Sequence, residues 1–327
     1  MKIRILELGS TFFQLHGFEV TVAGAVRHRW GIKRAVHLID GLASDGTLSA
    51  EYAKAGADAI ADLLLDSLDD HPLVCFATSA VREARNRYVL LDPLARRFGV
   101  VPRILSGEEE ARLAYAGALT ALDGPMHRVC VVDIGGGSTE VAVGDHRGVG
   151  FTHSARVGML LGEASASAFD SLLAPVLRRV RVYEPNRLVF ASGSARAIRT
   201  LLVAQGVIDR HAAVPTELLE RLLPNLTHLC APDFARFGVA GQEGSTLATG
   251  AQLILSVSRA LGRSYFDVSE AGLREGAALR EWNRRRLRPG GCVDPISDRP
   301  HVPYGAAAGG WLPSTPPLPR RLRAVAG

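Results

Sequence analysis

The feature that most constrains the fold is an internal repeat of two glycine-containing segments. Residues 6–17 read LELGSTFFQLHG and residues 132–144 read VDIGGGSTEVAVG. Each places an acid after an apolar strand and then a glycine turn before a second, alternating strand. Aligning Glu7 with Asp133 also aligns Gly9 with Gly135, at a single offset of 126 residues.

A second matched pair follows each of these segments. Residues 76–82 read FATSAVR and residues 190–196 read FASGSAR, at an offset of 114. Each predicts a strand that ends in small hydroxyl residues, followed by a helix with an arginine in its first turn. Two separate matches at similar offsets indicate two copies of one α/β unit.

Amphipathic helices are expected between these strands. Apolar spacing predicts helices at residues 49–68, 106–122, 246–261 and 272–282. Each half is then a hairpin-led sheet with helices packed on it. We expect a ligand in the cleft where the two glycine turns face each other.

Composition places the chain among soluble two-domain proteins. It has 327 residues, of which 47% are hydrophobic and 22% charged. The N-terminal MKIRILELGS enters a strand directly, without the pattern of a signal peptide, and no run approaches the ~18 apolar residues of a membrane span. We therefore expect a cytoplasmic protein without membrane contact.

The formal net charge of +5 belongs to the C-terminal end. Residues 281–327 carry eight arginines against three acids, which leaves the rest of the chain near neutral. From about Arg284 the composition turns to proline, glycine and arginine, so a disordered, solvated tail is predicted over residues 284–327. We expect no nucleic-acid partner, and an anion site in the body must arise from local geometry.

The cysteines do not form a metal-binding or redox motif. Cys75, Cys130, Cys230 and Cys292 are scattered without CxxC spacing. Cys75 and Cys130 lie in apolar runs, which predicts buried free thiols.

The glycine turns can bind an anion. One such turn can be a simple tight hairpin, but two turns that each follow an acid favour phosphate binding, because glycine lets backbone N–H groups approach an anion. Hydroxyl donors accompany both turns, at Ser10, Thr11, Ser138 and Thr139. Asp133 is predicted to be a direct or water-mediated Mg²⁺ ligand, with Glu140 as an assisting acid.

Three adjacent glutamates lie in the segment SGEEEARLAYAG. Ser106 followed by Glu109 is a capping box, which gives Glu109 a structural task. Glu108 and Glu110 remain, and either one complements the helix dipole or activates a water beside a phosphate. Arg82 is either a surface arginine or a phosphate-binding fork.

These motifs carry a resemblance to a known family. In chain order LGST, ATSAVREARN, LSGEEEARLAYAG, VVDIGGGSTEVAVG, ASGSARAI and GLREGAAL resemble the exopolyphosphatase and guanosine pentaphosphate phosphohydrolase family, within the superfamily of actin and sugar kinases. The resemblance covers about residues 1–283. It implies an α/β fold of two ribonuclease-H-like (actin-like) domains around a central cleft, a Mg²⁺ requirement, no nucleotide cofactor and a homodimer. The corresponding boundaries are 1–123, 124–283 and the tail at 284–327.

The resemblance also assigns roles to residues. Glu110 corresponds to the general base and Arg82 to the arginine that steadies phosphate charge. The metal-side acids correspond to Asp133 and Glu140, with Glu7 at the acid of the first loop. The substrate-binding set comprises Gly9, Ser10, Thr11, Gly135, Gly136, Gly137, Ser138, Gly193 and Ser194.

The first loop departs from the family pattern. Where the family reads Asp-Leu-Gly-Ser-Asn-Ser, this chain has Glu7, Thr11 and Phe12 at the changed positions. Such a change alters activity if it misplaces a group by about an ångström. The C-terminal helical domain of the long members is also absent from the pattern, which suggests a short form that does not process very long chains.

The predicted activity is removal of terminal orthophosphate from inorganic polyphosphate or guanosine pentaphosphate by Mg²⁺-assisted attack of water. Two alternatives stand beside it. One is a non-catalytic polyphosphate or alarmone sensor, suggested by the altered first loop. The other is a superfamily kinase or ATPase, which the single glycine of ASGSARAI does not favour, since an adenosine loop is expected to be richer in glycine.

Overall fold

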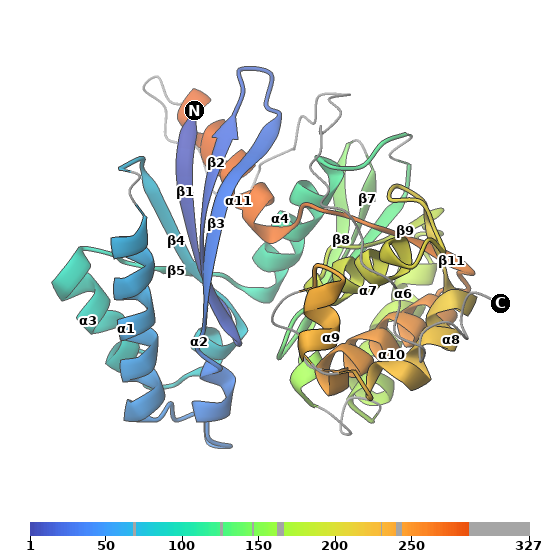
Figure 1. Cartoon of the computed structure of the whole chain (residues 1–327). Helices are drawn as coiled ribbons and strands as arrows, with labels where there is room; N and C mark the ends of the chain where they lie inside the picture. The colour runs from blue at the N-terminus through green and yellow to red at the C-terminus, as the bar shows by residue number, and fades with distance from the viewer. Residues whose placement is uncertain are drawn as a thin grey trace. The chain divides into compact units, whose positions relative to one another are not determined.

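The chain forms two compact units, each built on one β-sheet (Figure 1). The computed structural model describes residues 1–67, 70–124, 127–145, 147–161, 167–229, 231–239 and 244–287. Unit 1 comprises Met1–Thr120 together with the helix that begins at Leu273, and unit 2 comprises Ala121–Gly272. The two units are described in turn.

Unit 1 contains a sheet of strand order β3-β2-β1-β4-β5. The first three strands are antiparallel, while β4 runs parallel to β1 and β5 parallel to β4. Its elements are β1 (Lys2–Leu8), β2 (Phe12–Val20), β3 (Val26–Ala35), η1 (Leu38–Gly41), α1 (Ala50–Asp66), β4 (Leu73–Ala77), α2 (Ser79–Glu83), α3 (Tyr88–Phe98), β5 (Arg103–Ile104), α4 (Gly107–Leu119) and α11 (Leu273–Arg286).

Unit 2 contains a sheet of strand order β10-β11-β9-β6-β7-β8. Its elements are β6 (Val129–Ile134), β7 (Thr139–Asp145), β8 (Gly148–Ala155), η2 (Met159–Leu161), η3 (Phe169–Leu173), α6 (Ala174–Arg181), β9 (Arg187–Phe190), α7 (Gly193–Ala204), β10 (Val214–Pro215), α8 (Thr216–Leu226), α9 (Ala231–Arg236), α10 (Gly244–Ala260) and β11 (Tyr265–Val268).

The two sheets confirm the duplication that the sequence predicts. In unit 2, β6, β7 and β8 form an antiparallel meander, β9 runs parallel to β6, and β11 runs parallel to β9. The order β8-β7-β6-β9-β11 therefore repeats the order β3-β2-β1-β4-β5 of unit 1. Both glycine turns join the first two strands of their sheets.

Alternation along β1 divides the core of unit 1 into two layers. Leu6 and Leu8 point into one hydrophobic cluster with α1 and α3, whereas Ile3 and Ile5 point into the other with α11. Glu7 follows the same alternation as Ile3 and Ile5, so it lies on the α11 face. This placement decides which partner its carboxylate meets.

The C-terminal helix differs from the expected domain division. The expected division places residues 273–283 in the second domain and begins a disordered tail at Arg284. Instead α11 packs on α4 in unit 1, where Gly276 allows a close helix approach, and it continues to Arg286. Arg284 and Arg285 both donate to the carboxylate of Glu281, which extends the helix into the expected tail. Residues 288–327 lie outside the described residues.

The expected free thiols are confirmed at Cys75 and Cys130, which are buried and unbridged. Burial raises the pKa of the Cys75 thiol and raises that of Cys130 to about 12. Both are therefore neutral and inert at ordinary pH. Cys230 and Cys292 lie outside the described residues.

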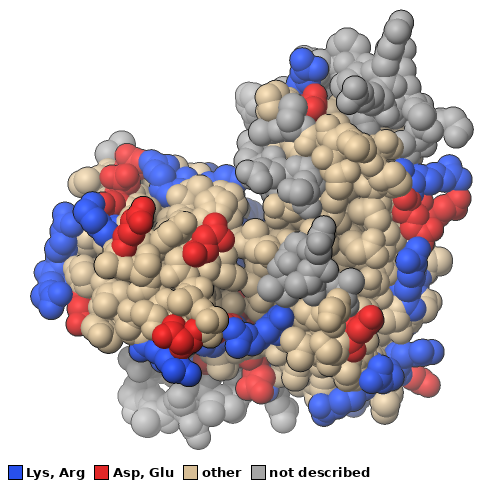
Figure 2. Space-filling model, turned by 90° about the horizontal axis from the view of Figure 1, so that it is seen from below, with Lys and Arg blue, Asp and Glu red and all other residues tan. Residues whose placement is uncertain are grey.

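The charged surface carries both signs. On the face shown in Figure 2, Lys and Arg side chains are interspersed with Asp and Glu side chains. An anion site on this face therefore depends on local geometry. Among the described helices, none is long and apolar enough to cross a bilayer.

Candidate functional site

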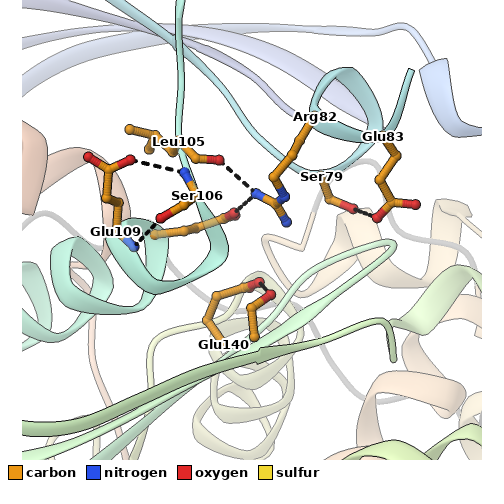
Figure 3. Close-up of polar contacts among 9 residues, drawn as sticks. Ser79, Arg82, Glu83, Leu105, Ser106, Glu109 and Glu140 are labelled. Atoms are coloured by element: carbon orange, nitrogen blue, oxygen red, sulfur yellow. Dashed lines mark hydrogen bonds and ion pairs between the residues drawn. The ribbon is translucent and has the colours of Figure 1, made fainter. Parts of the chain in front are cut away.

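Arg82 and Glu110 form an ion pair in unit 1 (Figure 3). Arg82 lies in α2, directly after strand β4, and Glu110 lies in the first turn of α4. Nη1 of Arg82 donates to Oε2 of Glu110 at 2.8 Å and to the carbonyl oxygen of Leu105 at 3.1 Å. The side chain of Glu110 is only 9% exposed, so the guanidinium compensates for its desolvation and fixes its orientation.

The three glutamates of α4 have three different environments. The hydroxyl of Ser106 accepts from the backbone N–H of Glu109, whose carboxylate accepts from the N–H of Ser106. This confirms the capping box, and Arg103 holds the same carboxylate from outside. Glu108 is exposed and Glu110 is buried. Burial thus distinguishes Glu110 from Glu108, between which the capping box does not choose.

An arginine at the corresponding place in unit 2 makes a similar backbone contact. Nη1 of Arg196 donates to the carbonyl oxygens of Ala191 and Ser269, at 2.8 and 3.3 Å. Ser269 follows the last parallel strand of its sheet, as Leu105 does in unit 1. The carbonyl contact is therefore a property of the repeated fold, and it holds each arginine beside the end of a sheet.

A backbone hydrogen bond closes the first glycine turn, and the acid before the turn, Glu7, forms an ion pair. The N–H of Gly9 donates to the carbonyl oxygen of Phe12 at 3.1 Å, and a Cβ on Gly9 would lie 2.8 Å from that oxygen. Glu7 accepts from Nη1 of Arg274 at 2.9 Å. Ser10 is buried, and Thr11 is half-buried with its carbonyl oxygen bonded to the chain after β3.

The second glycine turn has the same closure. The N–H of Gly135 donates to the carbonyl oxygen of Ser138 at 2.8 Å, which repeats the Gly9 bond at the same offset. Gly136 and Gly137 are partly exposed, whereas Ser138 is buried. The hydroxyl of Thr139, expected among the phosphate donors, instead donates to the carbonyl oxygen of Val157 at 2.5 Å.

Asp133 and Glu140 lie opposite each other on β6 and β7. Cys130, Val132 and Ile134 point into the hydrophobic core of unit 2, so Asp133 and its cross-strand neighbour lie on the opposite face. Glu140 is 3% exposed and its Oε1 accepts from the hydroxyl of Ser154 at 2.7 Å. Two carboxylates at directly opposite positions repel each other, which a bound cation would relieve.

The pair fits a magnesium ion chemically. Mg²⁺ prefers oxygen ligands and commonly uses one or two carboxylates, with water and phosphate oxygens completing its shell. Asp133 and Glu140 supply that set within unit 2. Within the described ranges no three His, Cys, Asp or Glu residues gather into a metal cage. Glu7, the third expected metal-side acid, is paired to Arg274 in unit 1.

Gly193 and Ser194 open helix α7. The hydroxyl of Ser192 caps this helix by accepting from the N–H of Ala195. Ser194 is 1% exposed and lies against Gly250 of α10, where any Cβ on the glycine would lie 2.8 Å from Cβ of Ser194. Its side chain is therefore part of the helix packing, and Gly193 has open space around it.

The partners of several candidate residues were not predictable from local sequence patterns. Arg274 belongs to the GLREGAAL segment, but its pairing with Glu7 spans 267 positions and has no local signal. Ser154 could have been found by continuing the register of the second hairpin to its third strand. The turn at η2 behind the second glycine turn carried no sequence signal beyond Gly158.

Solved structures share this two-unit architecture. A member of the Ppx/GppA protein family from Aquifex aeolicus superimposes with a TM-score of 0.70 at 19% identity, over 88% of this chain and 99% of that one. An exopolyphosphatase from Cytophaga hutchinsonii gives a TM-score of 0.74 at 21% identity, over 87% and 98%. These likenesses define the fold as α/β with two actin-like domains, as expected.

The model of the Ppx/GppA phosphatase family matches residues 24–285, and the chain belongs to that family. This confirms the resemblance seen in the motifs. A guanosine-5'-triphosphate,3'-diphosphate pyrophosphatase from Photobacterium profundum is 27% identical over 303 residues, 86% of this chain. The aligned region is 59% of that relative and 57% of its counterpart from Aliivibrio fischeri, so the chain spans less than two thirds of their length.

Proposed function

We propose that the protein is a phosphohydrolase that removes terminal orthophosphate from inorganic polyphosphate or from guanosine pentaphosphate. By their names, one of the proteins compared above is a pyrophosphatase of a guanosine nucleotide and another is an exopolyphosphatase. Both names denote enzymes that act on linked phosphate groups. Family membership and the ion pair between Arg82 and the buried Glu110 support the proposal. The ion pair of Arg82 with Glu110 is the structural observation on which the proposed activity rests.

Glu110 is the proposed general base in unit 1. Its carboxylate takes a proton from a water molecule as the water oxygen attacks the terminal phosphorus. A new P–O bond forms between the water oxygen and the terminal phosphorus, and the terminal P–O–P bond breaks. Orthophosphate is released, and the negative charge of the broken bond stays on the end oxygen of the shortened chain. Arg82 holds the base in place. Among the described residues the hydrogen bonds of its guanidinium use Nη1 alone, so its other donors suit a phosphate oxygen.

The proposed contribution of unit 2 is phosphate and metal binding. Backbone N–H groups of the second glycine turn bind phosphate oxygens, and Asp133 with Glu140 would hold Mg²⁺. When bound, the ion offsets phosphate charge. Catalysis then rests on positioning and preorganised electrostatics.

The test compares two neighbouring glutamates on one helix. Orthophosphate release from tripolyphosphate and from guanosine pentaphosphate is measured with Mg²⁺ for wild type, Glu110→Gln and Glu108→Gln. We expect Glu110→Gln to lose at least a hundredfold in rate, within the usual range for a general base, and the exposed Glu108→Gln to keep the wild-type rate. Equal rates for wild type and Glu110→Gln would remove the proposed base.

One observation favours a binding protein without turnover. The carboxylate of Glu7 is engaged by Arg274, at the acid of a loop that departs from the family pattern. In that case wild type binds tripolyphosphate and releases no orthophosphate. The double change Glu7→Asp with Thr11→Asn is then expected to restore hydrolysis if the first loop alone is responsible.

The remaining expectations stay proposals. We propose a cytoplasmic location and a homodimer, and we propose no nucleic-acid or membrane partner. The mixed signs on the surface shown in Figure 2 agree with a site that binds its anion locally rather than by a broad basic field.

A further inference from the structure

Two backbone hydrogen bonds connect the second glycine turn to the short helix η2. The N–H of Met159 donates to the carbonyl oxygen of Gly135 at 3.0 Å, and that of Leu160 donates to the carbonyl oxygen of Gly136 at 2.9 Å. Two consecutive peptide carbonyls of the turn therefore point toward η2.

This fastening also orients the other side of the same peptides. In a trans peptide the C=O and the following N–H point in opposite directions within one plane. Fixing the carbonyls of Gly135 and Gly136 directs the N–H groups of Gly136 and Gly137 away from η2, side by side. Neither N–H has a hydrogen-bond acceptor within the described part of the chain, and both residues are partly exposed. Successive N–H groups aimed in one direction form an anion-binding nest.

Gly158 makes the close approach of η2 possible. A Cβ at this position would overlap the carbonyl group of Gly136 and lie 2.7 Å from the carbonyl carbon of Gly137. The backbone of Gly158 is not in the left-handed region, so the reason for glycine is space. Because the obstructing atoms are backbone, a side chain here must move the glycine turn itself.

A buried hydrogen bond holds the segment before Gly158. The hydroxyl of Thr139 donates to the carbonyl oxygen of Val157, and Thr139 is fully buried. The hairpin that carries the glycine turn and the segment that supports it are thus joined on both sides of Gly158.

The first repeat has a related support, in which the N–H groups of Val36 and His37 both donate to the carbonyl oxygen of Thr11, at 2.8 and 2.9 Å. There η1 follows the third strand, and the N–H of Ile39 donates to the carbonyl oxygen of Ser10 at 3.2 Å. The residue before η1 is His37, with a φ of 49° and an exposed side chain. A residue with a Cβ is accommodated at that place in unit 1, whereas unit 2 requires the glycine.

We propose that Gly158 is a positioning residue, which seats η2 against the second glycine turn so that the N–H groups of Gly136 and Gly137 bind one phosphate group of the substrate. This inference rests on the proposed function, because it assigns that turn to phosphate. Gly158 acts through the turn and does not touch the substrate.

The test measures binding without turnover. Calorimetry with imidotriphosphate, whose P–N–P links resist hydrolysis, is performed with Mg²⁺ on wild type, Gly158→Ala and Gly150→Ala, and each unfolding temperature is recorded. Gly150 lies on β8, where an added Cβ meets Cε1 of Tyr183 at an ordinary 3.6 Å. We expect Gly158→Ala to bind about tenfold more weakly or worse, because hydrogen bonds to a charged group are misaligned, and Gly150→Ala to bind as wild type does.

A second pair of variants decides the matter if Gly158→Ala does not fold. Thr139→Val removes the hydroxyl that holds Val157 and keeps the side-chain shape, while Thr139→Ser keeps the hydroxyl. We expect several-fold weaker binding for Thr139→Val and near wild-type binding for Thr139→Ser. A purely structural role of this bond would lower the unfolding temperature of Thr139→Val and leave its affinity unchanged.

The outcomes separate this inference from the function on which it rests. Folded Gly158→Ala that binds imidotriphosphate as tightly as wild type overturns the positioning role and leaves the phosphohydrolase proposal standing. Equal affinity of Thr139→Val and Thr139→Ser has the same meaning. Wild type that binds no imidotriphosphate removes the phosphate role of the turn altogether.

Discussion

Arg82 connects the local fold of unit 1 to a single carboxylate. Its bond to the Leu105 carbonyl matches the backbone contacts of Arg196 in unit 2, so the repeated architecture delivers an arginine to this place. Its bond to Glu110 uses the same nitrogen. One guanidinium nitrogen thus satisfies a strand end and orients a buried acid, while the rest of the planar group extends beyond them.

Replacing Arg82 by lysine tests this division of tasks. An ammonium keeps the charge but lacks the planar fork, so it cannot hold the carbonyl and the carboxylate and also present further donors in fixed directions. We expect kcat/KM for tripolyphosphate to fall roughly 10- to 100-fold. Release of orthophosphate and the unfolding temperature are measured together, to separate catalysis from stability.

The matched control is Arg96→Lys, on the exposed face of α3 in the same unit. This change should leave both quantities at their wild-type values. An Arg82→Lys enzyme with full activity would show that charge alone suffices, and the oriented guanidinium would then have no role.

The residues of the candidate site were predictable where their signals are local. The capping box separates Glu109 from its neighbours because an N-cap serine and an N3 glutamate are only three positions apart. The pairing of Glu7 with Arg274 was not predictable, because it depends on which face of β1 the last helix covers. Burial of Glu110, rather than Glu108, likewise follows from tertiary packing.

At the scale of elements, close packing against α11 helps to fix the position of α4. Gly276 of α11 faces the backbone of α4, where an added Cβ would overlap the carbonyl group of Leu113 and lie 3.1 Å from the nitrogen of Gly117. Such a contact between helix backbones is possible only without a side chain. Since Glu110 lies on α4, the helix contact contributes to the placement of the acid.

We predict that Gly276→Ala destabilises the protein by about 1–3 kcal/mol, the usual range for overpacking. An alanine in a helix interior otherwise gains up to about 1 kcal/mol over glycine, so the sign of the change is diagnostic. Urea unfolding measures the free energy, and orthophosphate release should fall along with it because α4 shifts.

Gly56→Ala is the comparison, in helix α1. There an added Cβ lies 3.1 Å from Cδ1 of Leu90 and Cε2 of Phe13, so side chains rather than backbone have to shift, by a few tenths of an ångström. We expect its stability to stay within about 1 kcal/mol of wild type. A Gly276→Ala protein as stable as this control would mean that the two helices separate without penalty.

The elements themselves were largely predictable, and their partners less so. Apolar spacing located α1, α4, α10 and α11 to within a few residues at most ends, because each has a periodic face. The sequence did not indicate that α11 returns to unit 1, since its apolar face would fit either sheet.

At the scale of the whole molecule, the two units differ in chain continuity. Among the described residues, unit 2 comes from the single stretch Ala121–Gly272 and has its own large hydrophobic core. Unit 1 is completed by a helix that the chain supplies only after unit 2. Without α11, the cluster around Ile3, Ile5 and Phe18 loses the residues that cover it.

This asymmetry predicts how fragments behave. Residues 121–272 expressed alone should unfold cooperatively, because a segment of this size buries enough apolar surface for an independent core. Residues 1–120 alone should expose the face that α11 covers and aggregate or fail to fold. Residues 1–120 joined to residues 273–287 through a flexible Gly/Ser linker of about ten residues should recover cooperative unfolding. Circular dichroism during urea titration distinguishes these results. If residues 1–120 fold cooperatively without the helix, then α11 is an accessory to unit 1 and the destabilisation predicted for Gly276→Ala should shrink accordingly.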